Sequence, residues 1–236
     1  MVTVGNETMT NRISNADPAS WDTFNLKHLI PTGNRGICLD LGCGPGAKKD
    51  LENYGYTYIG LDLRPTSGNH VVADAEKLPF GNASIELVIA ASSFEHFPDP
   101  MQAAKEVARV LKPGGHFVGS ISFLEPYHAH SHFHLTHLGA KKIFENTGLT
   151  IDKMEPFEWT GPEAISQAIY QCSIARWLTA AIIRPSLWLR RTMLNILLRY
   201  YRHDPKKERI EEFINEEKYR FTAGIKIKAS KHYNKL

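Results

Sequence analysis

Short apolar segments recur along the first two-thirds of the chain and alternate with segments of helical periodicity. Runs in which apolar residues alternate or dominate predict strands over residues 37–41, 57–63, 71–73, 85–91, 116–123 and 150–156. Apolar residues spaced three and four apart predict helices at residues 21–30, 47–53, 101–111 and 136–148. Strands that alternate with helices predict an α/β fold, with a parallel sheet, right-handed crossovers and helices on both faces.

Two regions depart from this alternation. The first 20 residues are polar and rich in Asn and Thr, which is typical of a loose arm. From residue 159 to residue 219, apolar residues at helical spacing predict a helical insertion, because the segment is far longer than a hairpin connection. A last alternating run predicts one more strand, with one face formed by Phe221, Ala223, Ile225, Ile227 and Ala229. The predicted parts are an N-terminal arm and helix (1–35), a core (36–158), the insertion (159–219) and a final core strand (220–236).

The first predicted strand runs directly into a glycine-rich turn, Gly42-Cys43-Gly44-Pro45-Gly46. Glycines remove Cβ atoms where the backbone must turn tightly, and a turn that enters a helix presents free N–H groups to a ligand. The spacing Gly42-x-Gly44-x-x-Ala47 also satisfies the dinucleotide fingerprint of dehydrogenases. The glycines alone therefore predict a nucleotide-type ligand site and leave its ligand open.

Two acidic residues near this turn help to decide which ligand the site binds. Asp40 lies inside the first strand, where a dehydrogenase would carry an apolar side chain, so its burial requires a cationic or N–H partner. We expect a ligand ammonium group or N–H groups of the loop to supply that partner. Asp62 follows the second strand, where a carboxylate accepts ribose hydroxyls in any βαβ nucleotide site. A helix cap or an ordinary surface acid is the alternative for Asp62.

The segment Leu-Asp-Leu-Gly-Cys-Gly-Pro-Gly resembles the first motif of class I S-adenosylmethionine-dependent methyltransferases of the type 11-like group. The resemblance implies a Rossmann-like, seven-stranded, mostly parallel sheet with helices on both faces and an antiparallel last strand. It implies S-adenosyl-L-methionine as the cofactor, with Asp74 accepting from the adenine amino group; an Asp that caps a helix turn is the alternative. The cofactor-binding residues that it implies are Asp40, Gly42, Cys43, Gly44, Pro45, Gly46, Asp62, Leu63, Asp74, Ala75, Glu76, Ala91 and Ser92.

Glu95-His96 follows the fourth predicted strand, at the sheet edge where ligands lie in open α/β folds. The methyltransferases that this chain resembles commonly carry a Glu-His pair at this place. In them, the residues before the pair flank the methionine part of the cofactor. An imidazole can take up a proton near neutral pH, so His96 is the candidate catalytic base. The alternative is that His96 only shapes the substrate pocket.

Five histidines follow the fifth predicted strand, at positions 128, 130, 132, 134 and 137. In an extended chain the first four would project from one face, a pattern that suits a metal site built from neutral imidazoles. No cysteine or close pair of carboxylates completes a ligand set, so we predict no metal centre. The resemblance instead implies a substrate loop, and the substrate-pocket candidates are His96, Tyr127, His128 and His132.

The insertion mixes Arg and Trp with Leu and Ile. Arg176 and Arg184 interrupt its apolar stretch, which is therefore shorter than the about 20 residues needed to span a bilayer. Pro185 is expected to break the helical run, and a second apolar segment begins at Trp188. Such a segment is typical of a lid, a homodimer surface or a helix that lies on a membrane surface.

Composition adds only broad limits. A formal net charge of +3 and a hydrophobic content of 42% are ordinary globular values. Nucleic acid is an unlikely partner, because the basic residues sit among leucines and form no exposed stripe. Cys38, Cys43 and Cys172 are an odd number without metal-ligand spacing, and the N-terminus lacks the features of a signal peptide. We therefore expect a cytoplasmic protein, with peripheral membrane contact through the insertion as a further option.

The resemblance implies methyl transfer from S-adenosylmethionine, and we expect it to go to an oxygen or nitrogen of a small-molecule, lipid-linked or sugar-linked acceptor. One alternative is a catalytically silent protein of the same fold that binds the cofactor or a partner. A nucleotide-dependent dehydrogenase is the other alternative.

Overall fold

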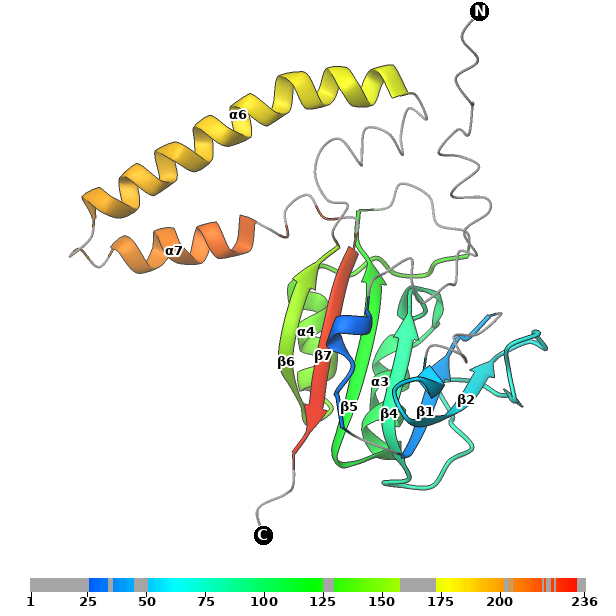
Figure 1. Cartoon of the computed structure of the whole chain (residues 1–236). Helices are drawn as coiled ribbons and strands as arrows, with labels where there is room; N and C mark the ends of the chain where they lie inside the picture. The colour runs from blue at the N-terminus through cyan, green and yellow to red at the C-terminus, as the bar shows by residue number, and fades with distance from the viewer. Residues whose placement is uncertain are drawn as a thin grey trace, which may run out of the picture. The chain divides into compact units, whose positions relative to one another are not determined.

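A seven-stranded sheet with the strand order β3-β2-β1-β4-β5-β7-β6 forms the frame of the protein (Figure 1). The pairs β1–β2, β2–β3, β1–β4 and β4–β5 are parallel, and β7 runs antiparallel to its neighbours. This arrangement confirms the predicted fold class. The strands are β1 (Gly36–Leu41), β2 (Tyr56–Asp62), β3 (Val71–Val72), β4 (Ile85–Ala91), β5 (Leu111–Ser122), β6 (Leu149–Pro156) and β7 (Gly224–Lys231).

The computed structural model describes residues 26–33, 36–44, 51–124, 130–157, 173–201, 204, 206–217, 219, 222 and 224–232. The predicted arm, the first half of the helix 21–30, the start of the helix 47–53, and the site candidates Pro45, Gly46, Tyr127 and His128 lie outside these residues. The chain divides into two compact units. One comprises Met1–Ile121, Ser131–Met154 and Lys226–Leu236, and the other Ser122–His130 and Glu155–Ile225.

The strand order reverses between β1 and β4. From β1 the chain moves outward to β2 and β3, and it then crosses back to β4 and β5 on the other side. The turns that follow β1 and β4 therefore leave the sheet in opposite directions. In open α/β folds, ligands bind outside the carboxyl ends of the strands at such a reversal.

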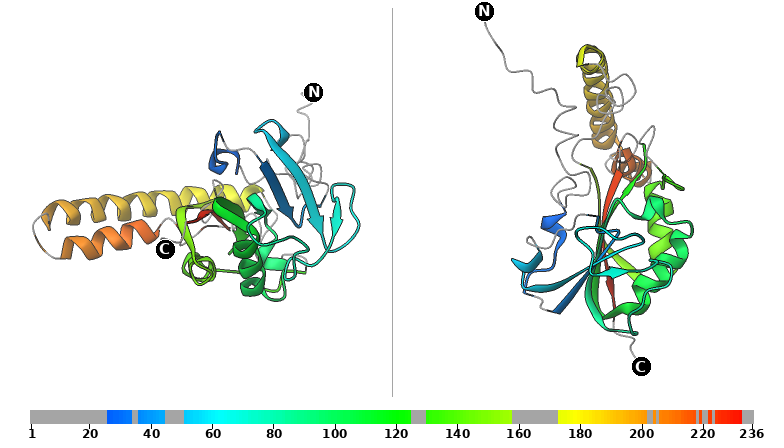
Figure 2. Two further views of the ribbon diagram at one scale, coloured as in Figure 1. Left: turned by 90° about the horizontal axis from the view of Figure 1, so that it is seen from below. Right: turned by 90° about the vertical axis from the view of Figure 1, so that its right-hand side faces the viewer.

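Helices cover both faces of the sheet. Helices α3 (Pro100–Val110) and α4 (His137–Glu145) lie on one face, and the short 3-10 turn η1 (Lys27–Leu29) lies on the other (Figure 2). Asp99 caps α3 by accepting from the Gln102 N–H at 2.9 Å. Thr136 caps α4 by accepting from the Gly139 N–H at 3.1 Å, as predicted for this helix start.

Four phenylalanines pack together beneath the carboxyl end of β4. Phe94 lies in the 3-10 turn η2 (Phe94–His96), and its ring centroid is 5.5 Å from that of Phe117 on β5 and 5.2 Å from that of Phe144 on α4. Phe97 contacts Phe94 edge-on at 5.1 Å, and Phe117 stacks on Phe144 at 4.5 Å. Aromatic pairs at these separations attract beyond their burial, so the cluster fixes η2 against the sheet.

Strand β5 begins earlier than predicted. Leu111 already pairs with Ile85, whereas the next regular pair is Leu87 with His116, so the ladder is irregular between them. The Lys-Pro-Gly-Gly segment, expected only to end the preceding helix, forms this irregularity. Lys112 lies in it and pairs with Glu86 across the two strands.

The prediction that Pro185 breaks the helix of the insertion is wrong. A single helix, α6 (Ser173–Tyr200), continues through Pro185, and α7 (Lys206–Glu217) packs against it. Proline removes one backbone hydrogen bond, to the carbonyl four residues earlier, which here belongs to exposed Ala181, where water can replace the lost donor. Among the described helices, none is long and apolar enough to cross a membrane.

Strand β7 departs from simple alternation. Ile225, Ile227 and Ala229, predicted to share one face, are fully buried, but Lys226 between them and Ser230 after them are also buried. The strand lies between β5 and β6 inside the sheet, so both of its faces are covered.

The Glu86 carboxylate joins β4 to β1 and β5 by contacts that are lost in acid. Its carboxylate accepts from the Ile37 N–H at 2.6 Å and pairs with Lys112. Burial raises the pKa of Glu86, but the bonds from Lys112 and Ile37 outweigh it and hold the pKa below its usual value. The hydrogen bond from Arg109 likewise lowers the pKa of Glu106. Both groups bind protons more weakly when folded, so their contribution is complete above the unfolded pKa of about 4.3 and is lost as the pH falls through the folded pKa.

We therefore expect these two carboxylates to leave the melting temperature unchanged between pH 7 and pH 5 and to lower it below about pH 4.5. Glu86→Gln should lower the melting temperature at pH 7 and reduce the acid-induced fall by about 2–4 °C. Calorimetric melts of both proteins across this range measure the effect. An identical acid profile for Glu86→Gln would contradict this role of Glu86.

Candidate active site

The turn after β1 is held against β2 by backbone hydrogen bonds. The N–H groups of Gly42 and Cys43 donate to the Leu61 carbonyl at 2.8 and 3.1 Å. Gly42 and Gly44 adopt φ values of +67° and +51°, in the left-handed region that favours glycine. The turn is therefore a fixed feature of the sheet edge, in a conformation that other residues would adopt only with strain.

Asp62 joins the end of β2 to this turn. One carboxylate oxygen accepts from the Gly44 N–H at 3.1 Å, and the other accepts from the Arg64 N–H at 3.2 Å. A carboxylate offers about four acceptor positions, so these two bonds leave room for further donors. Leu63 follows with 66% of its surface exposed, which places an apolar side chain beside the acid.

Asp40 is buried in β1, and one of its partners is a tyrosine. The Tyr58 hydroxyl on β2 donates to the carboxylate at 2.8 Å. We expected a ligand ammonium or loop N–H groups in this role. The tyrosine supplies one of the hydrogen-bond donors that a buried carboxylate needs.

The neighbouring Cys43 thiol is protonated at neutral pH. Burial is the largest cause that raises its pKa, to about 11, and the charge of Asp40 is the second. Because only a thiolate is a strong nucleophile, Cys43 does not act as one.

Two serines after β4 join the end of this strand to its neighbours β1 and β5. The Ser93 hydroxyl can donate to the Leu41 carbonyl at 2.9 Å or to that of Ala91 at 3.1 Å. Ser92 has a φ of +46°, which is unusual for a residue with a side chain, and its N–H bonds to Ser120 on β5. Strained backbone of this kind gathers at functional sites, and here it falls at the reversal of strand order.

The segment after β3 carries Asp74, Ala75 and Glu76. Asp74 is exposed, and one of its carboxylate oxygens accepts from the Glu76 N–H at 2.8 Å, the turn-capping role that the sequence left open. Ala75 is buried. The Glu76 carboxylate accepts from the Asp99 N–H at 2.7 Å, so this side chain is used to join the segment to the start of α3.

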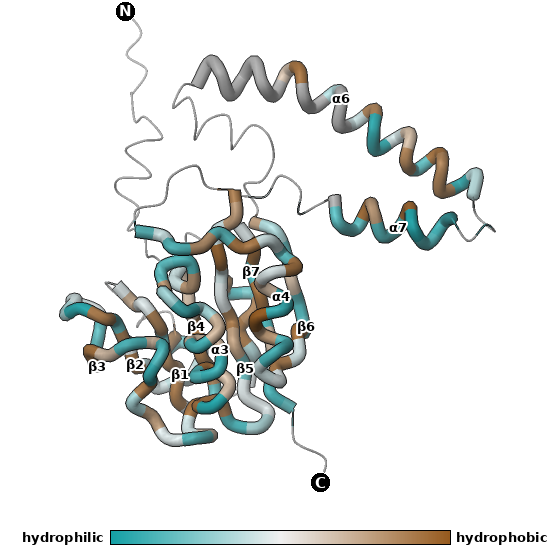
Figure 3. Tube along the Cα trace, turned by 180° about the vertical axis from the view of Figure 1, so that it is seen from behind, coloured by the Kyte–Doolittle hydropathy of each residue, from teal (hydrophilic) through white to brown (hydrophobic). Residues whose placement is uncertain are grey.

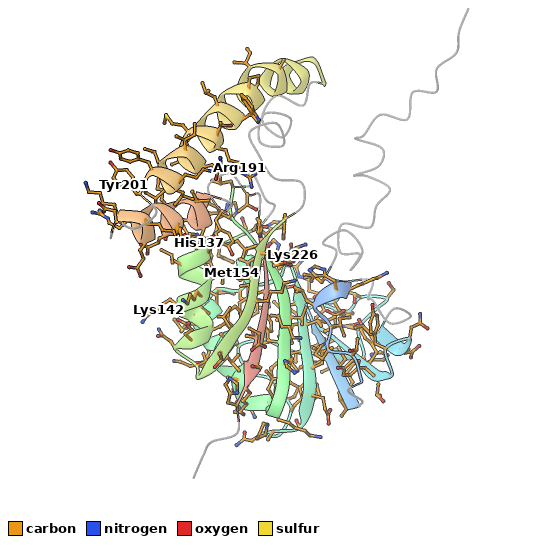
Figure 4. All side chains as sticks on the ribbon, turned by 60° about the vertical axis from the view of Figure 1, so that its left-hand side comes forward. His137, Lys142, Met154, Arg191, Tyr201 and Lys226 are labelled. Atoms are coloured by element: carbon orange, nitrogen blue, oxygen red, sulfur yellow. The ribbon has the colours of Figure 1, made fainter. Side chains whose placement is uncertain are left out.

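His96 and His132 belong to segments that are far apart in the sequence but are joined by hydrogen bonds to one backbone carbonyl. The Glu95 carbonyl in η2 accepts from the N–H groups of His132 and Phe133, at 2.6 and 3.2 Å. His96 is half-buried at the end of η2, while His132 and Phe133 are exposed. The segment continues to His137 at the start of α4 (Figure 4). This connection brings part of the histidine run to the carboxyl end of β4.

Comparison with known proteins agrees with this geometry. A family model described as a methyltransferase domain matches residues 39–119, which contain the glycine turn and the acids. An uncharacterized methyltransferase of Mycobacterium leprae is 33% identical over 186 residues, which cover 66% of this chain and 68% of the relative. The chain belongs to the class I S-adenosylmethionine-dependent methyltransferases.

Other similar proteins show how far this likeness extends. A sterol 4-C-methyltransferase of Caenorhabditis elegans is 33% identical over 98 residues, 34% of this chain and 29% of that protein. A Mycobacterium methyltransferase is 32% identical over 111 residues, 42% of this chain. The chain spans 29% and 44% of the lengths of these two relatives.

Two solved structures share the fold of this methyltransferase. A Haloferax volcanii putative methyltransferase, solved with a methyltransferase activator, has a TM-score of 0.59 at 17% identity and covers 98% of this chain and all of its own. Phosphoethanolamine N-methyltransferase 2 of Haemonchus contortus, in complex with S-adenosyl-L-methionine, has a TM-score of 0.52 at 15% identity, covering 91% of this chain and 53% of its own.

The cofactor of the methyltransferase is S-adenosylmethionine, and the residues at the sheet edge fit it. Asp62 retains acceptor positions for hydroxyl donors, and exposed Leu63 offers an apolar surface to a ring. A Cβ on Gly42 would lie 2.6 Å from the Ser93 hydroxyl oxygen, so only glycine fits there. The individual ligand roles of these residues remain predictions.

Sequence analysis did not identify Arg109, which fixes the segment after Asp74. From α3, its guanidinium donates to the carbonyls of Leu78 and Phe80 at 3.0 and 2.8 Å and pairs with Glu106. An arginine near a helix end carries no local signal of this role, because its partners lie about 30 residues earlier in the chain.

Over the described residues, no group of three or more His, Cys, Asp or Glu could hold a metal ion.

Proposed function

We propose that this methyltransferase methylates an oxygen or nitrogen nucleophile on a small-molecule, lipid-linked or sugar-linked acceptor. The observation that carries the proposal is the meeting of His96 with the His132 segment at the Glu95 carbonyl. It supplies two imidazoles at the sheet edge where the acceptor of an open α/β enzyme lies. An oxygen or nitrogen acceptor loses a proton when it is methylated, and an imidazole can take it.

The roles of the chain's own residues follow from this arrangement. When bound, S-adenosylmethionine supplies a methyl group made electrophilic by a positively charged sulfur. Asp62 and Asp74 hold the adenosine part, through the ribose hydroxyls and the adenine amino group. His96 takes the proton that the acceptor loses, and His132 helps to orient the acceptor. Since positioning dominates such a transfer, the phenylalanine cluster contributes by holding η2 still.

The names of related proteins leave the acceptor atom open. The nematode relative is named for a carbon of a sterol, and the Haemonchus protein of the same fold for the nitrogen of phosphoethanolamine. The choice of oxygen or nitrogen here rests on His96 and the His132 segment, which meet at the Glu95 carbonyl. A lipid-derived acceptor is compatible with both names.

A methyl-transfer screen tests the proposal. Purified protein and S-adenosylmethionine with a labelled methyl group are incubated with extracted metabolites and lipids, and labelled products are identified by mass spectrometry. We expect one class of product with a new O-methyl or N-methyl group, and His96→Gln should lower the kcat of its formation at least about a hundredfold at pH 7 with little change in cofactor affinity. Cofactor binding without any labelled product would favour the catalytically silent alternative.

A further inference from the structure

Helix α6 carries a stripe of exposed apolar side chains. Ile182, Leu189, Met193, Ile196 and Tyr200 are separated by seven, four, three and four residues, so they lie on one side of the helix. Their exposed fractions are 71, 64, 56, 60 and 80%. Trp188 is 69% exposed farther around the same helix. The brown positions that recur along α6 in Figure 3 include the aliphatic residues and the methionine of this stripe.

The partner helix α7 does not cover the stripe. The Arg190 guanidinium lies over the Phe213 ring of α7, 5.3 Å from its centroid. Arg190 follows Ile182 by eight residues, which places it about 80° around the helix from the stripe. Leu194 and Leu197, which point to the side of Arg190, are more buried than the stripe residues. The apolar side of α6 that contacts α7 and the exposed stripe are therefore different surfaces.

The charge on α6 is entirely positive. Its sequence contains five arginines and no acidic residue, whereas α7 carries five glutamates. Arg199 is exposed on the flank of the stripe that also presents Trp188, about 100° around the helix from Ile182, whereas exposed Arg191 lies on the side opposite the stripe. An exposed apolar stripe with an arginine and a tryptophan beside it, on a helix without acidic residues, is the composition of helices that lie in a membrane interface.

We propose that α6 binds the surface of an anionic lipid bilayer. The stripe enters the boundary between headgroups and acyl chains, Arg199 contacts lipid phosphate, and Trp188 and Tyr200 lie at headgroup depth. The helix has 28 residues and is about 42 Å long, enough to lie along the surface over several turns. This inference is independent of the proposed acceptor, because it depends only on the helix and its charge.

Charge favours lipid over a second copy of the chain as the occupant of this stripe. In a symmetric dimer the same face meets itself, so one positively charged α6 would pack against another. Like charges brought together at an interface oppose association. An anionic bilayer offers the complementary sign, and the attraction to it should weaken as salt increases.

Flotation of the full chain with lipid vesicles tests the proposal. The vesicles contain either phosphatidylcholine alone or phosphatidylcholine with about 30% phosphatidylserine. We expect binding to the anionic vesicles only, with a loss of at least tenfold for Met193→Ser/Ile196→Ser and of about fivefold for Arg199→Gln. Lys141→Gln, which removes an exposed positive charge from α4, is the matched control and should bind like the unchanged protein.

Circular dichroism melts and cofactor binding confirm that each variant is folded. Three outcomes would overturn the proposal: no flotation of the unchanged protein, equal flotation with neutral vesicles, or variants that bind as well as Lys141→Gln. A fourth is a dimer, measured by light scattering, that Met193→Ser/Ile196→Ser converts to a monomer without changing flotation. That result would assign the stripe to a second copy.

Discussion

Replacing Asp62 by alanine should raise the dissociation constant of S-adenosylmethionine at least about a hundredfold. The substitution removes the predicted acceptor for the ribose hydroxyls and also the carboxylate that holds the Gly44 N–H at 3.1 Å. Hydrogen bonds to a charged group are worth about 1.5–3 kcal/mol each, so the loss of two such bonds to the ligand exceeds two orders of magnitude. Isothermal titration calorimetry with the cofactor and with S-adenosylhomocysteine measures the change.

Two further variants separate ligand contact from damage to the fold. Asp62→Asn keeps the shape and one acceptor oxygen, so we expect an intermediate affinity. Asp152→Ala on β6 removes a carboxylate that accepts from Ser230 at 2.7 Å, and it should lower stability with an unchanged dissociation constant. Unchanged affinity in Asp62→Ala would refute the ribose assignment.

Local patterns in the sequence were sufficient for most of the sheet. Strands β1, β2 and β4 lie within one residue of their predicted bounds, because apolar runs bounded by turns are local signals. The irregular start of β5 was missed, since its first residue pairs with Ile85 and the pairing depends on a strand 26 positions away. Pro185 was misjudged because the cost of proline depends on whether the freed carbonyl is exposed, which sequence does not reveal.

The candidate site likewise contains some features that local sequence patterns predict and others that depend on contacts between distant residues. The sequence predicted where the glycine turn and the acids after β2 and β3 lie, because each sits at a fixed offset from the end of its own strand, and their ligand roles stay predictions. The Tyr58 hydroxyl on Asp40, the Glu95 carbonyl that binds the His132 N–H, and the Arg109 contacts with Leu78 and Phe80 each join residues 18 or more positions apart. Such contacts depend on how the strands and loops are placed, and they carry no periodic signal.

Gly42→Ala should destabilise the protein by about 3–4 kcal/mol and abolish measurable cofactor binding. An alanine at φ +67° is strained, and its Cβ would lie 2.6 Å from the Ser93 hydroxyl oxygen. Gly33→Ala is the matched control, since Gly33 has a φ of +82° and nothing within 4 Å of the added Cβ. It should cost only about 1 kcal/mol, the strain alone. Urea unfolding of both variants measures the difference, and equal losses would show that the contact with Ser93 is unimportant.

A double-mutant cycle assigns the remaining loss in Gly42→Ala to that contact. Ser93→Ala removes the oxygen at 2.6 Å and leaves a Cβ at 3.0 Å, so it should relieve the clash only in part. Alone, it should cost about 1 kcal/mol, because the Ser93 hydroxyl no longer bonds to the Leu41 carbonyl. We expect the double variant to be at least about 1 kcal/mol more stable than additivity requires. Strict additivity would mean that the turn relaxes away from Ser93, and the fixed approach of the β1 and β4 ends would then not be what requires glycine at this position.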